Sequence, residues 1–287
     1  MKKITFAFLA ILLAVIACST SPVSAPPQVN QPGVETVVAA TMQSLTPTAP
    51  ALAGTAIKFG NVSLVNPLGL ASNINGAQMP AIVGDQNGAP WDAGPAHIEL
   101  TLDGYVTQGG FSMAKVYIYP AQEFAAANTG AAQNLIRLQT LLLNPNGNIT
   151  NDTLPHVPFF NAAQIFAAQV KIVKFQNGSG VRMVTQYGQA PSPVINNSIF
   201  YHFEGLTSDG KYYIIAILPI TAPTLAYGDA SNLPVPPGGV PFPGYDSPDL
   251  VPYFNAVTTM LNSTAPEMFN PTINILDALI ASIQVVN

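Results

Sequence analysis

Two short patterns in this chain place a histidine and a glutamate where they could act together. They are His-Ile-Glu at 97–99 and His-Phe-Glu at 202–204. In a β-strand, side chains two residues apart point to the same face. If the two strands are neighbours, the four side chains offer the nitrogen and oxygen ligands that suit Zn²⁺ or a similar ion; these candidate ligands are His97, Glu99, His202 and Glu204.

A simpler interpretation of the two patterns is that they lie on a solvated surface. Both pairs alternate with apolar residues, which is typical of a strand with one buried and one wet face. We therefore expect these histidines and glutamates on the wet face, and the sequence predicts no bound metal and no cofactor. The third histidine, His156, lies between two proline-containing dipeptides and is expected in a loop.

No familiar catalytic motif accompanies these residues. Serine catalysis needs a base and an orienting acid around the nucleophile, and the chain has no Gly-x-Ser-x-Gly pattern; Gly178-Ser179-Gly180 is better explained by a turn. The glycine-rich motifs that cradle phosphates are also absent from the sequence. An enzyme with an unfamiliar, hydrolase-like site is the alternative, and it would use carboxylates such as Glu99, Asp103, Glu204 and Asp209.

The first residues have the features of an export signal. Lys2 and Lys3 precede residues 4–17, which are apolar except for Thr5. This run is too short to span a bilayer and has the length of a signal-peptide core. It ends Val-Ile-Ala-Cys at 15–18, which resembles the lipobox of bacterial lipoproteins. The resemblance implies that residues 1–17 are a signal peptide and that Cys18 becomes the lipidated first residue of the mature protein.

Lipidation of Cys18 would fix the location of the protein. Each buried methylene of an acyl chain contributes roughly 0.8 kcal/mol, so several chains suffice for stable attachment. We expect an extracytoplasmic protein held on the cell membrane or the outer membrane by its lipid. An uncleaved helix or an ordinary secretory signal is the alternative. Cys18 is the only cysteine, so lipidation would leave neither a disulfide nor a thiol nucleophile.

Charge limits the possible partners. The precursor has a net charge of −5, and only 8% of its residues are charged. Binding to nucleic acid requires clustered lysine and arginine, and so does electrostatic binding to anionic lipid headgroups. Neither is expected, and the predicted partners are the membrane through the lipid anchor and an envelope protein or glycan.

Composition divides the mature chain into a tether and a domain. Residues 18–55 hold six prolines among Ser, Thr, Ala and Gln, which favours a semi-extended spacer. Apolar residues at helical spacing within 34–45 indicate a short helix, either transient or lying on the membrane or a partner. We assign residues 56–287 to one domain, which is long enough for a sizeable core.

The domain is expected to be α+β. Alternation predicts strands at 57–65, 98–103 and 113–119, and two hairpins at 166–187 and 200–220 that form an antiparallel meander. Helices are predicted at 120–127 and from Asn128 to the Asn144-Pro145 stop, at 250–261, and from an Asn270-Pro271 start. Grouped strands with flanking helices favour an antiparallel sheet covered by helices.

One stretch of the C-terminal third resembles a known family. The hairpin strand at 201–206, the turn and strand Asp-Gly-Lys-Tyr-Tyr at 209–213, and the helix end at 279–283 are similar to PsbP-like domains. That resemblance implies an antiparallel sheet flanked by helices, in a group that includes lipoproteins and photosystem accessory proteins. The long insert at 221–247 departs from the family pattern.

Two long segments, 66–95 and 221–247, are predicted to be irregular loops. Their aromatic residues could stack on sugars or anchor a protein partner. The favoured alternative is that the rings pack down and pin the loops to the domain. The candidate binding residues are Trp91, Tyr227, Phe242 and Tyr245.

These features together predict a non-enzymatic domain that binds or scaffolds something at the cell envelope. An envelope enzyme and an accessory subunit of a membrane complex are the alternatives.

Overall fold

The computed structural model describes residues 53–84, 91–107, 113–147, 149–157, 162–229 and 233–286. The predicted signal peptide, Cys18 and the tether up to residue 52 lie outside the described residues. Within the described part, every helix is too short or too polar to cross a lipid bilayer.

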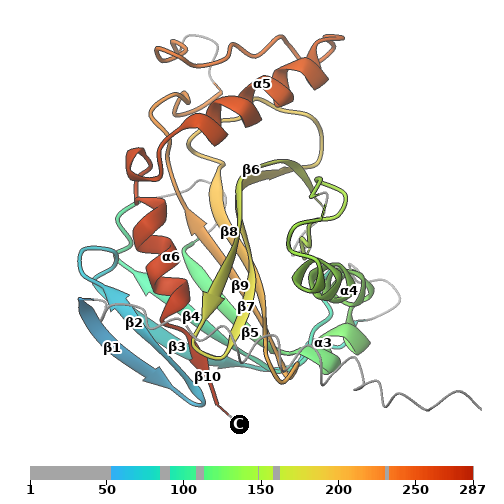
Figure 1. Cartoon of the computed structure of the whole chain (residues 1–287), viewed down its shortest axis with the longest axis vertical. Helices are drawn as coiled ribbons and strands as arrows, with labels where there is room; N and C mark the ends of the chain where they lie inside the picture. The colour runs from blue at the N-terminus through green and yellow to red at the C-terminus, as the bar shows by residue number, and fades with distance from the viewer. Residues whose placement is uncertain are drawn as a thin grey trace, which may run out of the picture. The chain divides into compact units, whose positions relative to one another are not determined.

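The centre of the fold is a seven-stranded antiparallel sheet with the strand order β3-β4-β5-β9-β8-β7-β6 (Figure 1). Together with the helices beside it, this sheet confirms the predicted α+β class. Its strands are β3 (Asn73–Met79), β4 (His97–Asp103), β5 (Lys115–Pro120), β6 (Ala163–Phe175), β7 (Gly178–Gly188), β8 (Phe200–Thr207) and β9 (Tyr212–Pro219).

The predicted meander is confirmed, since β6, β7, β8 and β9 pair in sequence order. The β8–β9 turn needs a left-handed residue, which Gly210 supplies with φ of 72°. At this turn the Asp209 carboxylate accepts hydrogen bonds from the Thr207 hydroxyl at 2.7 Å and from the Lys211 amide at 3.1 Å. Turn chemistry therefore sets the register of this pair.

The N-terminal strand predictions are partly wrong. Residues 57–65 do not form one strand but belong to two, β1 (Gly54–Phe59) and β2 (Val62–Pro67), because Gly60 reverses the chain at φ 56°. These two strands and β10 (Gln284–Val285) form a second, three-stranded sheet. The segment 66–95, expected to be irregular, contains β3. This edge strand buries only Ile74, so it lacks the alternation that identifies a strand from sequence.

The helices agree well with the predictions except at one start. They are α3 (Ala121–Ala127), α4 (Thr129–Leu143), α5 (Leu250–Ser263), the 3₁₀ turn η1 (Pro266–Met268) and α6 (Ile273–Ala281). Asn128 caps α4, with its Oδ1 accepting the Ala131 amide at 3.0 Å. The Asn270-Pro271 start of α6 is wrong by two residues, because the Thr272 hydroxyl accepts the Ile275 amide and caps the helix instead.

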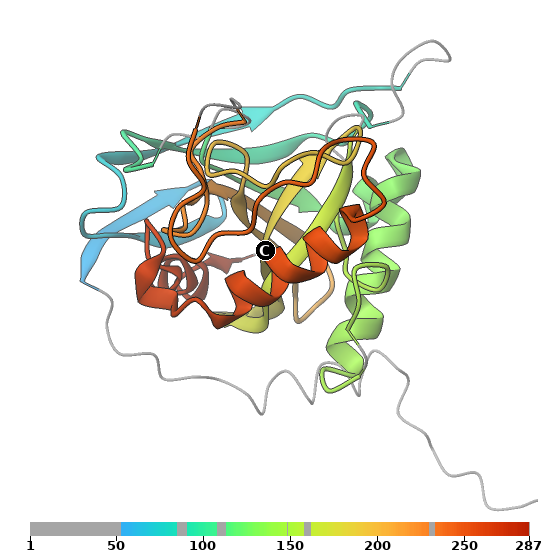
Figure 2. The same cartoon turned by 90° about the horizontal axis from the view of Figure 1, so that it is seen from above.

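Helices cover both faces of the sheet. On one face α5 and α6 pack on alternate side chains of the strands, and α6 buries Ile273, Leu276, Leu279 and Ile280 completely. On the other face α3, α4 and residues 154–157 cover β5, β7, β8 and β9. Figure 1 shows α6 and α4 on opposite sides of the sheet, and Figure 2 shows α5 on the side of α6. The central strands therefore have no solvated face.

Candidate functional site

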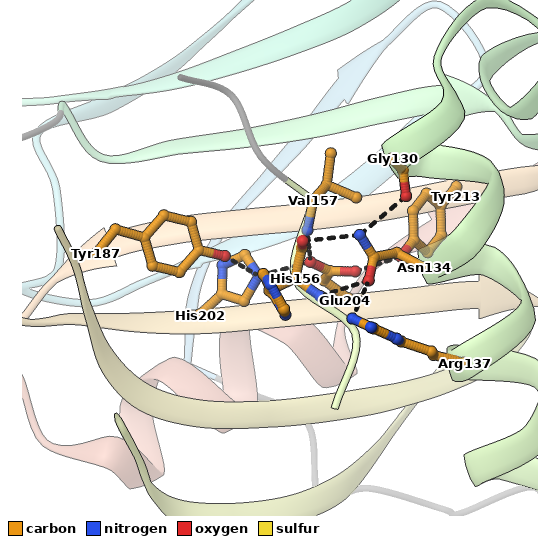
Figure 3. A network of polar contacts seen from close by, with 9 residues as sticks. All are labelled: Gly130, Asn134, Arg137, His156, Val157, Tyr187, His202, Glu204 and Tyr213. Atoms are coloured by element: carbon orange, nitrogen blue, oxygen red, sulfur yellow. Dashed lines mark hydrogen bonds and ion pairs between the residues drawn. The ribbon is translucent and has the colours of Figure 1, made fainter. Parts of the chain in front are cut away.

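Strand β8 places His202 and Glu204 on the face covered by α4 (Figure 3). Both side chains have an exposed fraction of 0%. The prediction that this pair lies on a wet face is therefore wrong. The alternation along β8 is real, but the side taken for solvent is buried beneath α4 and the segment that follows it.

The Glu204 carboxylate is surrounded by donors. Its Oε1 accepts the Val157 amide at 2.6 Å, and the His202 Nε2 lies 2.8 Å from the same oxygen. Its Oε2 accepts the Tyr213 hydroxyl. A buried carboxylate is costly unless donors replace the water that it loses. Three donors on three different segments fulfil that requirement and tie those segments together.

The Glu204 carboxylate determines which of its neighbours carry protons. Because the His202 Nε2 faces an acceptor, that nitrogen carries the ring proton, and the Tyr187 hydroxyl lies 3.5 Å from it. Burial raises the pKa of Tyr187 and Tyr213 well above the ordinary value, and the negative charge of Glu204 raises both further. Both hydroxyls therefore stay protonated and available as donors.

Residues 154–157, here called the strap, lie over the histidine and the glutamate. Asn134 of α4 holds the strap by its backbone: its Nδ2 donates to the His156 carbonyl at 2.7 Å, and its Oδ1 accepts the His156 amide at 3.1 Å. The same Nδ2 also donates to the Gly130 carbonyl at 2.9 Å (Figure 3). Burial lowers the pKa of the His156 imidazole, and the Glu204 charge opposes this shift. The strap is thus fastened to the sheet by Glu204 and to α4 by Asn134.

A histidine beside a carboxylate has the composition of a general base with its orienting acid. A general base must also lie within hydrogen-bond reach of the proton that it removes. Here His202 and Glu204 have no exposed surface, and Leu154 and Val157 of the strap are buried above them. The geometry therefore fits a polar core that fixes α4 and the strap on the sheet.

The second pair, His97 and Glu99, lies on the same face of the sheet but outside the core beneath α4. The His97 side chain is 10% exposed and that of Glu99 15%. The Lys115 ammonium lies 2.6 Å from Glu99 Oε2, and the His97 Nε2 lies 3.6 Å from Oε1, beyond hydrogen-bond distance. The other ring nitrogen of His97, Nδ1, donates to the Pro95 carbonyl at 3.0 Å, and the ring stacks on Tyr119 with centroids 4.2 Å apart.

The four candidate ligands do not form one site. Strands β5 and β9 separate β4 from β8, and the register places Glu99 opposite Tyr117, Tyr117 opposite Ile215, and Ile215 opposite Glu204. Over the ranges that the structure describes, no three side chains of His, Cys, Asp or Glu come together as metal ligands. The metal hypothesis required the strands of the two pairs to be neighbours, and β4 and β8 are not.

The carboxylates of the enzyme hypothesis are also dispersed. Asp103 is exposed at the end of β4, where it accepts a hydrogen bond from Asn75. Asp209 is exposed in the β8–β9 turn. The strand register places Asp103 and Asp209 at opposite ends of the sheet, with Glu99 and Glu204 between them on different strands. No two of these four carboxylates are placed to act on one substrate.

The four candidate binding aromatics have different environments. Phe242 is partly buried and packs on the core, with its ring centroid 5.2 Å from that of Tyr253. Trp91 is partly buried. Tyr227 and Tyr245 have exposed fractions of 64% and 62%. The expectation that the rings pack down holds for Phe242 and is wrong for the two tyrosines.

Sequence reasoning missed a second buried ionic contact, on the face beneath α6. The Arg182 side chain is 5% exposed, and its Nε donates to Asp277 Oδ1 at 3.2 Å. The Tyr201 hydroxyl donates to the same oxygen at 2.9 Å. Arg182 also donates to the backbone carbonyl of Gln169. Nothing in the local sequence signals this contact, because Arg182 and Asp277 are 95 residues apart.

Comparison with known proteins adds no relative: no family model, no curated protein and no solved structure matches this chain.

Proposed function

We propose that this protein is a lipid-anchored, extracytoplasmic domain that binds or scaffolds a partner at the cell envelope and carries out no catalysis. The lipobox resemblance at 15–18 supports the anchor, and the proline-rich segment 18–55 supports a spacer between membrane and domain. In this proposal Cys18 carries the lipid, and a protein or glycan of the envelope is the partner.

The proposal of a non-catalytic function rests on a contrast between buried and exposed side chains. The histidine-carboxylate cluster has no exposed surface, whereas Tyr227 and Tyr245 are more than half exposed on the segment between β9 and α5. Tyrosines are enriched among residues that dominate binding energy, since they combine a large apolar area with a polar tip. A partner can therefore contact the aromatic rings of Tyr227 and Tyr245.

Fractionation of cells that express the full chain tests the anchor. We expect the wild-type protein with the membranes, extractable by detergent, and a Cys18→Ser variant in the soluble extracytoplasmic fraction or retained as uncut precursor. Metabolic labelling with a radioactive fatty acid should mark the wild type alone. Equal labelling of both proteins, or a soluble unlabelled wild type, would remove the anchor from the proposal.

A thermal-shift screen tests the binding function. The sample is the mature chain with Cys18→Ser, and the panel holds cell-wall fragments, oligosaccharides and peptides. A ligand at about 100 times its dissociation constant adds roughly 2.7 kcal/mol to stability, which raises the midpoint measurably. We expect at least one ligand class to raise it, and Tyr245→Ala to reduce that shift. Turnover of a substrate that a single point mutation abolishes would contradict the proposal.

An accessory subunit of a membrane complex is a specific form of the same proposal. It predicts co-purification from detergent-solubilised membranes at a fixed stoichiometry, whereas a ligand-binding module predicts saturable binding by the isolated chain.

A further inference from the structure

Strands β3, β4 and β5 carry an array of polar side chains on the side of the sheet that holds α4. The register places Glu99 of β4 between Ala77 of β3 and Tyr117 of β5, and residues directly opposite one another on neighbouring strands share a face. Side chains two residues apart on one strand share that face as well. We call this array the β4 face, and it consists of Asn75, Ala77, His97, Glu99, Lys115 and Tyr117.

The β4 face is open toward the edge of the sheet. Within the described residues β3 is the outer strand (Figure 1), and its Asn75 and Ala77 are exposed. Glu99, opposite the small Ala77 side chain, is partly exposed. On the β5 side the array ends at Tyr119, whose ring stacks on Phe124 of α3 with centroids 4.0 Å apart. A ligand can therefore approach from the β3 edge.

One nitrogen on the β4 face has no hydrogen-bond partner. His97 donates through Nδ1 to the Pro95 carbonyl, so its Nε2 carries a lone pair. The side chain is only 10% exposed, and across the described part of the chain nothing donates to Nε2. Glu99 Oε1, 3.6 Å away, is itself an acceptor. A buried acceptor without a donor costs free energy, so this nitrogen calls for a donor from outside the chain.

The groups beside this nitrogen define what kind of ligand fits. The Lys115 ammonium donates to Glu99 Oε2 at 2.6 Å and lies 5.9 Å from the centroid of the Tyr117 ring. The charges of Lys115 and Glu99 cancel, so the six residues carry no net charge while His97 is neutral. Stacking on Tyr119, with centroids 4.2 Å apart, fixes the His97 ring. The β4 face thus combines acceptors, a donor and an aromatic ring without net charge.

We propose that the β4 face binds a neutral glycan, with one sugar hydroxyl donating to His97 Nε2. This inference rests on the proposed binding function and names the site and the chemistry of the partner. A hydroxyl both donates and accepts, so neighbouring sugar hydroxyls can donate to His97 and accept from Lys115. The apolar side of a sugar ring packs on Tyr117. Because Nε2 is not exposed in the free protein, the Glu99 side chain beside it must rotate to admit the hydroxyl.

The test is isothermal titration calorimetry of the mature chain carrying Cys18→Ser. The probes are maltotetraose, cellotetraose and the tetramer of N-acetylglucosamine, and we expect saturable binding of at least one. His97→Phe keeps a ring on Tyr119 but removes the Nε2 acceptor, and it should weaken binding about tenfold. Lys115→Met removes the donor and should weaken binding about fivefold.

A matched variant on another strand controls for loss of an ion pair. Lys171→Met takes the cation from the pair with Asp277, in which the Lys171 ammonium lies 3.5 Å from Oδ2. Its affinity for the tetrasaccharide should stay within about twofold of the unmodified chain. An equal loss in Lys115→Met and Lys171→Met would overturn the proposed site.

Nitrogen-15 NMR of the histidine rings locates the ligand without changing the site. The chain has three histidines, and His97→Phe identifies the ring signals of His97 by their loss. We expect the tetrasaccharide to shift the Nε2 signal of His97, because its lone pair gains a donor. The signals of His156 and His202, which lie beneath the strap or within it, should not move. This readout remains decisive even if a variant fails to fold.

The outcomes distinguish this inference from the proposed function. No binding of any tetrasaccharide, or binding that leaves the His97 Nε2 signal in place, would overturn the glycan site. A thermal shift from a peptide without binding of any tetrasaccharide would overturn the glycan site and keep the binding domain. A flat response to glycans, peptides and cell-wall fragments alike would overturn both.

Discussion

The same three-residue pattern, histidine-x-glutamate, has two different environments on one face of this sheet. On β4 the pair is partly exposed: Glu99 binds the Lys115 ammonium, and His97 carries its proton on Nδ1, toward the Pro95 carbonyl. On β8 the pair is completely buried: Glu204 receives three donors, and His202 carries its proton on Nε2, toward that carboxylate. The sequence pattern alone does not distinguish the two.

The difference arises from what lies above each strand. The apolar core beneath α4 includes side chains from β5, β7, β8 and β9, whereas β4 adds no apolar side chain to it and meets it through the His97 ring, which stacks on Tyr119. The Glu99 and Lys115 side chains are 15% and 20% exposed, so this ion pair retains some of its hydration. A buried carboxylate must replace all of its hydration with protein donors, so the removal of either partner is costly. The β8 pair should therefore contribute more to stability than the β4 pair.

The largest expected effect is the loss of the buried carboxylate. Glu204→Ala leaves Val157, His202 and Tyr213 without their acceptor, and we expect the free energy of unfolding to fall by about 3–5 kcal/mol. Glu99→Ala on β4 should cost less, about 1–2 kcal/mol, because the Lys115 ammonium that is left keeps some access to water. Urea denaturation measures both. Glu204→Gln keeps the shape and one acceptor, so it should remain folded and fall between them; equal losses at 99 and 204 would refute the comparison.

Removal of one donor should have a smaller effect. Tyr213→Phe leaves the Oε2 of Glu204 without its hydroxyl partner inside the core, which should cost about 1–3 kcal/mol. The matched change Tyr245→Phe removes an exposed hydroxyl and should stay within about 0.5 kcal/mol of wild type. Thermal melts of the two variants, recorded side by side, decide the point. A Tyr213→Phe protein as stable as Tyr245→Phe would mean that water replaces the hydroxyl.

The hydrogen bonds from Asn134 to the strap should affect local opening of the strap more than the stability of the whole domain. Asn134→Ala removes both hydrogen bonds to the His156 backbone, with an expected loss of about 1–2 kcal/mol. The more specific readout is amide hydrogen exchange at Val157, which should accelerate as the strap opens. Gln133→Ala, on the exposed side of the same helix, is the control and should leave that exchange rate unchanged.

The smallest expected effect is the pH dependence contributed by His156. Burial lowers the pKa of this imidazole below its ordinary value of 6.5 in the folded protein, so the unfolded chain binds a proton more readily. Stability should therefore fall as the pH drops below about 6.5, until the folded-state pKa is passed. His156→Gln should reduce this fall between about pH 8 and 5. Identical pH profiles for variant and wild type would show that His156 keeps its ordinary pKa.

Local sequence rules were sufficient for most elements of the domain. The hairpins of β6 to β9 follow from alternation and turn residues, and α4 follows from an apolar stripe between Asn128 and the Asn144-Pro145 stop. These features act over a few residues, so the sequence displays them directly. The signal peptide, the lipidation of Cys18 and the tether depend equally on local sequence, and they remain predictions.

Only the tertiary structure decided which polar residues are buried together. Glu204, Val157, Tyr213 and Asn134 come from four separate segments, and Arg182 meets Asp277 across 95 residues. Period-two alternation shows that two faces differ, but it does not show which face a helix will cover. That choice depends on where α4 and the strap pack, which is a property of the whole chain. Sequence determined the strands of the β6 to β9 meander, and packing determined which histidine and glutamate are buried.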